Sequence, residues 1–368
     1  MERIKMAGPW ITELEKRTVS DMMEYGWDNY DYVEKFEPAF AEWHNRKYCL
    51  MTPCCTHAIH LLLLALGIKK GDEIIVPECT WTATAAPITY LKAIPIFADI
   101  EESNWCLDPK SVESKITDKT KAIIAVDLYG NMPNMDELEI LSQNYDIPLI
   151  EDAAEALGSV FKGVRAGKFG IGAVHSFHRT KTMTTGEGGA LLLDDDKIYQ
   201  RAKFLRDHGR SSKIPYYTLE PTPKYMPSNF QGSMAWAQFL RINDLIDRKK
   251  YFLNRYKKNL NDIEDIQFNM ETDEVSNGVW ATTMVIGKSF GIDKIDAIDK
   301  LDKMNIPARP FFYPLSSLPA YSHYNSGSKI ENPIAYDISN RGITLACHYE
   351  LTDDQIDYIS DGIRKILK

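Results

Sequence analysis

The sequence predicts an α/β fold with a mostly parallel sheet and a smaller C-terminal α+β domain. Two patterns indicate this fold class. Short apolar runs rich in β-branched residues alternate with helix-like segments through the first part of the chain, and such strands are typical of sheets buried on both faces. Near residue 233 this alternation ends, and apolar residues recur at helical spacing. We therefore expect two domains, which comprise residues 1–245 and residues 246–368.

The strands of the large domain are expected where short apolar runs are bounded by turn residues. These runs are residues 48–51, 72–77, 93–100, 121–126, 147–150, 174–177 and 189–193. An amphipathic stretch at residues 134–144 is typical of the helices that connect parallel strands. Because ligands of such sheets bind outside the carboxyl ends of the strands, we expect the functional site at that edge.

The C-terminal part is expected to mix helices and strands. One long helix or two in series should cover residues 233–260, followed by a strand at 280–287, a helix at 293–304 and an extended segment at 308–312. Thr352 and Gln355 have the spacing of a capping box, which predicts the start of the last helix.

Composition and charge exclude several classes of protein. The chain has 368 residues, of which 44% are hydrophobic and 26% charged, as in folded globular proteins. The formal net charge of −9 disfavours a nucleic-acid-binding surface. The longest apolar run, residues 60–66, is far shorter than the roughly 20 residues that cross a membrane. The beginning of the chain has no apolar signal-peptide core, and the six cysteines show neither a disulfide framework nor zinc-ligand spacing, so we expect a cytoplasmic protein without a metal.

The first candidate for chemistry is the turn from a short strand into a helix at residues 52–57. The N-terminus of a helix presents unpaired backbone N–H groups and a positive dipole end, which together bind phosphate. Cys55 and Thr56 lie in this turn, and Thr56 adds a hydroxyl donor. The alternative is an ordinary capped helix packed on the sheet.

The second candidate is Asp152, which follows the apolar run at residues 147–150. A carboxylate at the end of a buried strand needs a cationic or hydrogen-bonding partner. Small residues follow Asp152 and leave room for a ligand. The alternative is an aspartate that caps a helix.

The third candidate is Lys181, which lies midway along the hydroxyl- and glycine-rich segment 176–189. A lysine in a confined site loses its proton more readily and acts as a nucleophile toward aldehydes. The alternative is a lysine on a solvated loop. A phosphate cradle, an acid and a lysine are together what pyridoxal 5'-phosphate requires, because the lysine forms a Schiff base and the acid keeps the pyridine nitrogen protonated.

At this point the sequence resembles the DegT/DnrJ/EryC1/StrS sugar aminotransferases, a family within the fold type I pyridoxal-phosphate enzymes. The resemblance covers nearly the whole chain. It is carried by residues 176–189 (SFHRTKTMTTGEGG), 151–154 (EDAA), 205–209 (LRDHG) and 128–130 (LYG). It implies a sheet of the aspartate-aminotransferase type.

The resemblance also implies roles for single residues. Lys181 matches the Schiff-base lysine and Asp152 matches the partner of the pyridine nitrogen. The other cofactor-binding positions are Cys55, Thr56 and Ser176 for the phosphate, Glu155 for the ring hydroxyl, Trp81 for stacking on the ring, and Asn229 for the phosphate of a neighbouring subunit. The last role implies a homodimer with shared active sites. The alternative for Trp81 is a tryptophan of the core.

The sequence departs from the family pattern in three places. Cys54 and Cys55 stand where Ser or Asn and Gly are usual, which predicts a turn without positive φ. Glu155 stands where many relatives have a neutral Gln, so it is either protonated or paired. Ser316 stands where a histidine is common, which weakens the transfer of substrate contacts.

The expected function is transfer of an amino group from L-glutamate, leaving 2-oxoglutarate, to a nucleotide-linked 4-keto-6-deoxy sugar. The family members that resemble the segment 309–313 most closely are perosamine synthases, which act in O-antigen synthesis. Substrate contacts are expected from Arg309, Tyr313, His178 and Arg341. The alternative for Arg309 is a pair with a surface acid.

Other functions stay open at this point. One is a 3-keto-sugar aminotransferase. A sugar 3-dehydratase of this family would have a histidine in place of Lys181. A non-catalytic cofactor-binding regulator would need a partner domain, for which the chain has no room. A dinucleotide-binding oxidoreductase would need a Gly-x-Gly-x-x-Gly motif after a strand, which the sequence lacks.

Overall fold

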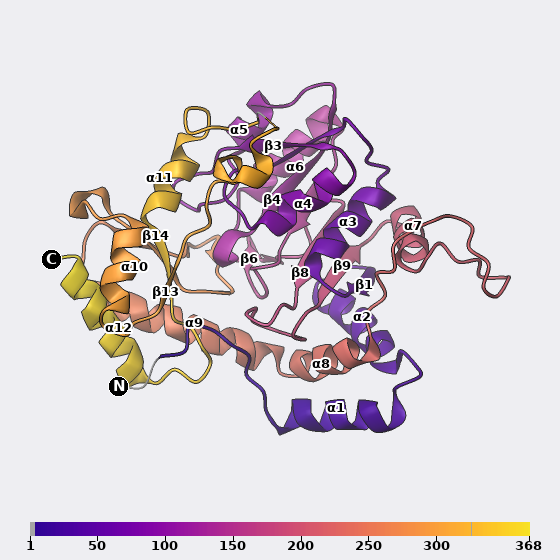
Figure 1. Ribbon diagram of the computed structural model, residues 1–368, viewed down its shortest axis with the longest axis horizontal. Helices are drawn as coiled ribbons and strands as arrows, with labels where there is room; N and C mark the ends of the chain where they lie inside the picture. Colours follow the sequence, from indigo (N-terminus) through magenta and orange to yellow (C-terminus); the bar gives the residue numbers. More distant parts are fainter. Residues whose placement is uncertain (1–3, 325) are drawn as a thin grey trace.

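The computed structural model describes residues 4–324 and 326–368. Figure 1 shows a large central sheet covered by helices on both faces and a smaller group of C-terminal elements at its side, with the helices α8 and α9 running between them. Within the described residues, no helix is both long enough and apolar enough to span a membrane.

The large sheet has seven strands in the order β1-β9-β8-β5-β4-β2-β3. Its strands are β1 Tyr48–Thr52, β2 Glu73–Pro77, β3 Ile94–Ala98, β4 Thr120–Val126, β5 Leu149–Asp152, β8 Gly172–Ser176 and β9 Gly189–Leu193. Only β9 runs against the other strands of this sheet, since it pairs antiparallel with both β1 and β8. The predicted mostly parallel sheet is therefore confirmed, and each predicted run corresponds to a strand within a few residues.

Helices cover both faces of this sheet because its strands are apolar on both sides. Leu50 packs in a cluster with α3 Cys55–Ala65, α4 Thr82–Tyr90 and α7 Asp196–Arg206, whereas its neighbours Cys49 and Met51 pack on the opposite face. The helices of that opposite face are α2 Asp31–Trp43, α5 Pro109–Ser114, α6 Met135–Tyr145 and α8 Asn229–Phe239. The result is a three-layer α/β/α arrangement.

The C-terminal part contains a four-stranded antiparallel sheet in the order β10-β12-β14-β13. The strands are β10 Ile266–Phe268, β12 Thr283–Ile286, β13 Ala308–Pro310 and β14 Gly342–Leu345, and the helices are α9 Ile242–Asn259, α10 Lys294–Asp302, α11 Pro333–Arg341 and α12 Asp353–Ile366. The helical pattern at residues 233–260 forms two helices in series, α8 and α9. The predicted capping box of α12 is confirmed.

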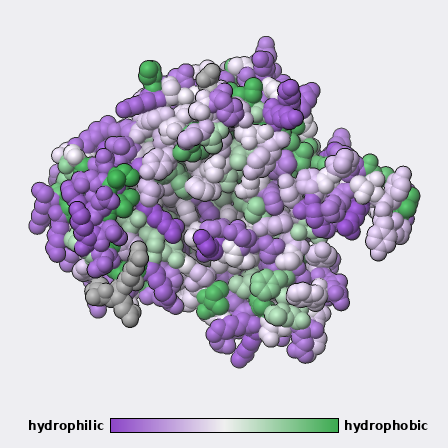
Figure 2. Space-filling view, in the orientation of Figure 1, coloured by the Kyte–Doolittle hydropathy of each residue, from purple (hydrophilic) through white to green (hydrophobic). Residues whose placement is uncertain are grey.

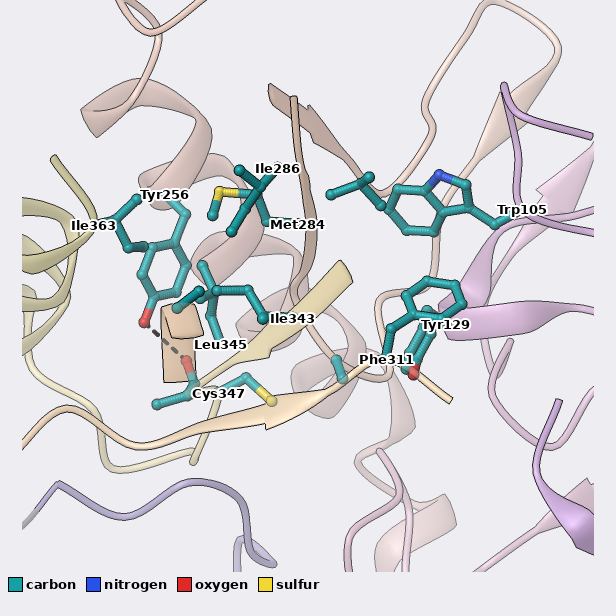
Figure 3. Close-up of a cluster of buried hydrophobic side chains, with 14 of the residues drawn as sticks. Trp105, Tyr129, Tyr256, Met284, Ile286, Phe311, Ile343, Leu345, Cys347 and Ile363 are labelled. Atoms are coloured by element: carbon teal, nitrogen blue, oxygen red, sulfur yellow. Dashed lines mark hydrogen bonds between the residues drawn. The ribbon is translucent and has the colours of Figure 1, made fainter. Parts of the chain in front are cut away.

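An apolar cluster joins the C-terminal elements to loops of the large sheet. Figure 3 shows Trp105 and Tyr129, which lie beyond β3 and β4, next to Phe311. The rings of Tyr129 and Phe311 are 4.9 Å apart. Farther from the large sheet, the Tyr256 hydroxyl donates to the carbonyl of Ala346 at 2.9 Å. This packing places the segment after β13 at the carboxyl edge of the large sheet. The predicted domain boundary near residue 245 falls inside α9 and stays a prediction.

Some elements were not predicted from the sequence. They include α1 Glu13–Tyr25, α2, α11, β10, β14 and a small three-stranded sheet of β6 Val160–Phe161, β7 Val164–Arg165 and β11 Val275–Ser276. Residues 207–224, after α7, form an excursion that projects from the molecule in Figure 1.

Candidate active site

The three candidate segments meet at the carboxyl edge of the large sheet. The turn after β1, the end of β5 and the loop between β8 and β9 all lie at this edge, because β1, β5 and β8 run in the same direction. Burial raises the pKa of the Cys55 thiol, and the charges of Asp152 and Lys181 both act on that thiol. The predicted phosphate turn, acid and lysine are therefore neighbours.

The turn into α3 presents free backbone donors. Cys54 is extended (φ −160°, ψ 164°), and its side chain makes no capping hydrogen bond. The first bonds of the helix run from the N–H groups of His57 and Ala58 to the Cys54 carbonyl, which leaves the N–H groups of Cys55 and Thr56 without a partner in the described chain. No residue of this turn has a positive φ, as the cysteines predicted. This end of α3 is a suitable phosphate site, not a side-chain-capped helix.

Gly189 allows β9 to approach this turn closely. A Cβ atom on Gly189 would lie 2.5 Å from the backbone nitrogen of Cys55, closer than real Cβ atoms come. Gly189 pairs with Ser176 at the end of β8. The Ser176 hydroxyl accepts a hydrogen bond from the His178 N–H at 3.3 Å. Ser176 is therefore paired with the glycine that contacts this turn, and its contact with the phosphate stays a prediction.

Asp152 ends β5 and is 3% exposed. Its Oδ2 accepts from the Thr84 hydroxyl at 2.8 Å, and its Oδ1 accepts from the Ala154 N–H at 3.2 Å. Burial raises the pKa of Asp152, whereas these hydrogen bonds and the charge of Lys181 oppose the rise. No helix starts at Asp152, so the helix-capping interpretation is wrong. Thr84 was not identified from the sequence, although it lies in the same segment as Trp81.

The Lys181 side chain is 12% exposed, which excludes the solvated-loop interpretation. Its Nζ donates to Glu155 Oε1 at 3.0 Å and lies 3.7 Å from the centroid of the Trp280 ring. The other Glu155 oxygen accepts from the Tyr129 N–H at 2.9 Å. Burial raises the pKa of Glu155 and the charge of Lys181 opposes the rise, so Glu155 is a paired carboxyl group. Trp280 was predicted only as part of a strand.

Aromatic side chains form one side of the site. Trp81 is 59% exposed, so it is not a core tryptophan, and its ring lies 5.7 Å from that of Phe312. The Phe312 ring stacks on Tyr129 at 5.2 Å and on Trp280 at 6.4 Å. We refer to Trp81, Phe312, Tyr129 and Trp280 as the aromatic wall. The wall runs from the start of α4 to Lys181.

Two predicted substrate residues lie near Lys181. Burial lowers the pKa of His178, and the Glu187 carboxylate at 3.6 Å opposes this shift. The positive charges of Lys181 and Arg309 add to the lowering of this pKa. Arg309 is exposed on β13 and has no acidic partner in the part of the chain that the structure describes. Tyr313, which follows the wall residue Phe312, is partly exposed and contacts the Lys294 ammonium group at 3.6 Å from its ring centroid.

Two predicted residues have other partners within the chain. Arg341 forms an ion pair with Asp337 at 2.6 Å and donates to the carbonyl of Ile286, so the structure does not bring it to Lys181. The Asn229 side chain is buried, donates to the Gly26 carbonyl at 2.7 Å and accepts from the Tyr32 N–H at 3.0 Å. Its contact with a neighbouring subunit stays a prediction.

These residues fit pyridoxal 5'-phosphate. Free amides at a helix N-terminus suit its phosphate, a buried acid suits its pyridine nitrogen, and a buried lysine suits its aldehyde. The fold and the site therefore define a pyridoxal-phosphate-dependent enzyme.

Comparisons with known proteins identify the family. The model of the DegT/DnrJ/EryC1/StrS aminotransferase family matches residues 9–364, and the chain belongs to this family. It is 34% identical to the GDP-perosamine synthase of Escherichia coli O157:H7, over 99% of each chain. It is 32% identical to the GDP-perosamine synthase of Vibrio cholerae, over 97% of each chain.

The fold agrees with that of a solved relative. The pyridoxal-phosphate form of the putative sugar aminotransferase Spr1654 from Streptococcus pneumoniae superposes with a TM-score of 0.93. The two chains are 27% identical, and the match covers 99% of this chain and 98% of the other. The chain is a pyridoxal-phosphate-dependent aminotransferase.

Proposed function

We propose that this chain, a pyridoxal-phosphate-dependent sugar aminotransferase, transfers an amino group from L-glutamate to a nucleotide-linked 4-keto-6-deoxy sugar and forms the 4-amino sugar. The observation that carries the proposal is the buried Lys181 amine, which lies beside the aromatic wall at the carboxyl edge of the sheet. Full-length relatives named GDP-perosamine synthase, at 34% and 32% identity, support the substrate class.

The cofactor would be held by groups at fixed positions. The amides of Cys55 and Thr56, together with the Ser176 hydroxyl, bind the phosphate. Asp152 pairs with the pyridine nitrogen, because Thr84 and Ala154 orient its carboxylate. Trp81 covers one face of the ring. When bound, the cofactor supplies an electron sink for the carbon that loses its proton.

Lys181 moves the proton. Its amine acts first as a general base, which takes the proton from the α-carbon of glutamate. It then acts as a general acid, which donates the proton to the cofactor. The low exposure of the Lys181 side chain limits the access of water to that proton. Glu155 accepts a hydrogen bond from this amine at 3.0 Å.

Arg309 would bind the phosphate groups of the nucleotide sugar. A nucleoside diphosphate is an anion and the chain has a net charge of −9, so the site needs a local positive group. Arg309 is exposed near His178 and forms no ion pair with an acid in the described chain, which leaves its planar fork free to bind phosphate oxygens. Its next residue, Pro310, restricts the backbone of Arg309 to extended conformations.

The test uses the yellow holoenzyme. Addition of L-glutamate should remove the visible absorbance band, and a 4-keto-6-deoxy sugar linked to GDP, UDP or dTDP should restore it. The position of the new amine is read by NMR of the product. Return of the band with the corresponding 3-keto sugars but not with the 4-keto sugars would overturn the assignment to carbon 4, and no response to any amino donor would overturn the transaminase.

The matched variants are Lys181→Ala and Lys300→Ala. The first removes the proton-transfer group and should abolish turnover. The second removes an exposed lysine that pairs with Asp296 on α10, and it should leave activity unchanged. Wild-type turnover by Lys181→Ala would contradict the role of Lys181.

A further inference from the structure

The Lys181 amine has two partners that the proton-transfer step does not itself require. Glu155 accepts its hydrogen bond at 3.0 Å, and the Trp280 ring lies under it at 3.7 Å. An ammonium group over the face of an indole is attracted by the negative face of the ring, most strongly where water is excluded. Carboxylate and ring thus hold the amine from two directions.

Trp280 is itself fixed in orientation. Its indole N–H donates to the carbonyl of Thr180, the residue before Lys181, at 2.7 Å. Its ring stacks on Tyr129 with centroids 5.7 Å apart and planes 4° apart. The residue is half-buried and lies just ahead of β12, 100 positions from Thr180. The C-terminal part of the chain therefore sets both the face presented to the amine and the position of the loop that contains it.

Glu155 is fixed as well. Its second oxygen accepts from the N–H of Tyr129 at 2.9 Å, and Tyr129 has a positive backbone φ of 55°. Tyr129 therefore supports both partners of the amine, Glu155 through its backbone and Trp280 through its ring.

We propose that Glu155 and Trp280 form a seat for the Lys181 amine whenever that amine is not covalently joined to the cofactor. Trp280 is a positioning residue: it limits the orientations of a flexible side chain, so that the amine returns to the cofactor from one direction. The inference rests on the proposed role of Lys181. A free lysine side chain has many rotamers, and their restriction speeds each return.

The first measurement observes the seat in the wild-type apoprotein. Lysine amines are reductively methylated with 13C-formaldehyde and a borohydride reductant, and the methyl signal of Lys181 is identified by its absence from Lys181→Ala. A methylated amine over an indole face is shielded by the ring current, so its signal should be displaced upfield from those of the other lysines. An undisplaced Lys181 signal would overturn the seat without any Trp280 variant.

The second measurement separates positioning from cofactor affinity. Apoprotein is mixed with pyridoxal 5'-phosphate, and the rate of covalent capture is followed by the visible band. Trp280→Leu removes the ring that restricts the Lys181 side chain and should slow capture about tenfold, because more rotamers then compete with the one that reaches the cofactor. Trp280→Phe keeps a ring and should recover most of the rate.

Pyridoxamine 5'-phosphate provides the control ligand, because it occupies the same site and cannot join to a lysine. Its affinity should change less than twofold in Trp280→Leu. If that affinity falls by the same factor as the capture rate, Trp280 has only a structural role and the proposal is wrong. If the capture rate does not change, the proposal is also wrong.

Trp43→Leu is the matched control variant. Trp43 is also half-buried, and the Arg165 guanidinium lies 3.9 Å above its ring. Its replacement should leave both measurements unchanged. A wild-type protein that captures no cofactor covalently would refute the proposed function itself, whereas normal capture by both wild type and Trp280→Leu refutes only the seat.

Discussion

Asp127 is a buried carboxyl group whose two oxygens have no hydrogen-bond partner in the described structure. It lies directly after β4, and its backbone N–H donates to the carbonyl of Asp152. Burial raises the pKa of Asp127 far above its ordinary value, and the nearby charge of Glu151 raises it further. Burial also raises the pKa of Glu151 to about 7, although the N–H groups of Gly167 and Phe169 bind its carboxylate.

This pair makes the stability of the protein dependent on pH. A carboxyl group with a raised pKa binds a proton in the folded state where the unfolded chain has already lost it. The contribution of Glu151 is therefore fully present below its ordinary pKa of 4.5 and is lost as the pH rises through about 7. The pKa of Asp127 is raised even further, so the folded protein must keep a proton on Asp127 at a pH where the unfolded chain has lost it. Asp127→Asn places a neutral side chain of nearly the same shape at this position and removes that cost.

Asp127→Asn should therefore raise the melting temperature relative to wild type at pH about 8 and change it little at pH about 5. The variant is compared with wild type at each pH. Burial lowers the pKa values of His44 and His175, which makes the free energy of unfolding rise with pH, and this contribution is the same in both proteins. Thermal unfolding across this range is the measurement, with the exposed Asp118→Asn as control. An equal effect at both pH values would show that the pair is not the cause.

Single site residues could be predicted from the sequence where the adjacent residues form a recognisable pattern. Asp152 follows an apolar strand, and Lys181 lies in a hydroxyl- and glycine-rich loop. Thr84 and Trp280 have no such local pattern, because Thr84 acts on Asp152 across 68 positions and Trp280 acts on Thr180 across 100. Contacts between residues so far apart in the sequence form only because of the fold, and the residues adjacent to Thr84 or Trp280 in the sequence give no sign of them.

Two elements, α3 and β9, meet so closely at the phosphate turn that their geometry depends on one glycine. A Cβ on Gly189 would lie 2.5 Å from the Cys55 nitrogen and 2.6 Å from the Cys54 carbonyl carbon. Both atoms belong to backbone, which moves only if the start of α3 moves. The position of the free amides is therefore set by the pairing of β9 with β1 and β8.

Gly189→Ala should displace the N-terminus of α3 and weaken the binding of pyridoxal 5'-phosphate more than it weakens folding. Overpacking of this kind costs about 1–3 kcal/mol. Gly172→Ala, at the other end of the sheet, is the control: its Cβ would meet the flexible end of Leu193 at 2.8 Å, far from the turn. Equilibrium dialysis measures cofactor affinity and thermal unfolding measures stability. A larger affinity loss in Gly172→Ala would contradict the argument.

The sequence predicted long apolar elements better than short or polar ones. The strand expected at residues 147–150 is instead β5 Leu149–Asp152, because Pro148 has no N–H for the ladder and Asp152 still pairs with Val174. The two-residue strands β6, β7 and β11 have no periodicity to detect. The site itself was predictable at this scale, since parallel strands bring their carboxyl ends to one edge.

The whole molecule has an exposed apolar face around α1 and α8, where Figure 2 shows apolar side chains at the surface. Its exposed members are Met23, Tyr25, Trp27 and Phe230. Trp27 is 72% exposed, and single exposed tryptophans beside other apolar groups are typical of interfaces. Asn229, at the start of α8, binds the Gly26 carbonyl and the Asn29 side chain, so it fixes the turn that presents Trp27.

The predicted homodimer with shared active sites should therefore depend on Trp27. Trp27→Glu places a charge on this face, and loss of an interface tryptophan commonly costs about 2 kcal/mol or more, or about thirtyfold in the dissociation constant. Sedimentation velocity should show a dimer for wild type and a shift toward monomer for Trp27→Glu, with cofactor retention falling in parallel. Ile140→Glu, at an exposed position on α6, is the control and should stay dimeric. A Trp27→Glu monomer with full specific activity would show that each active site is complete within one chain.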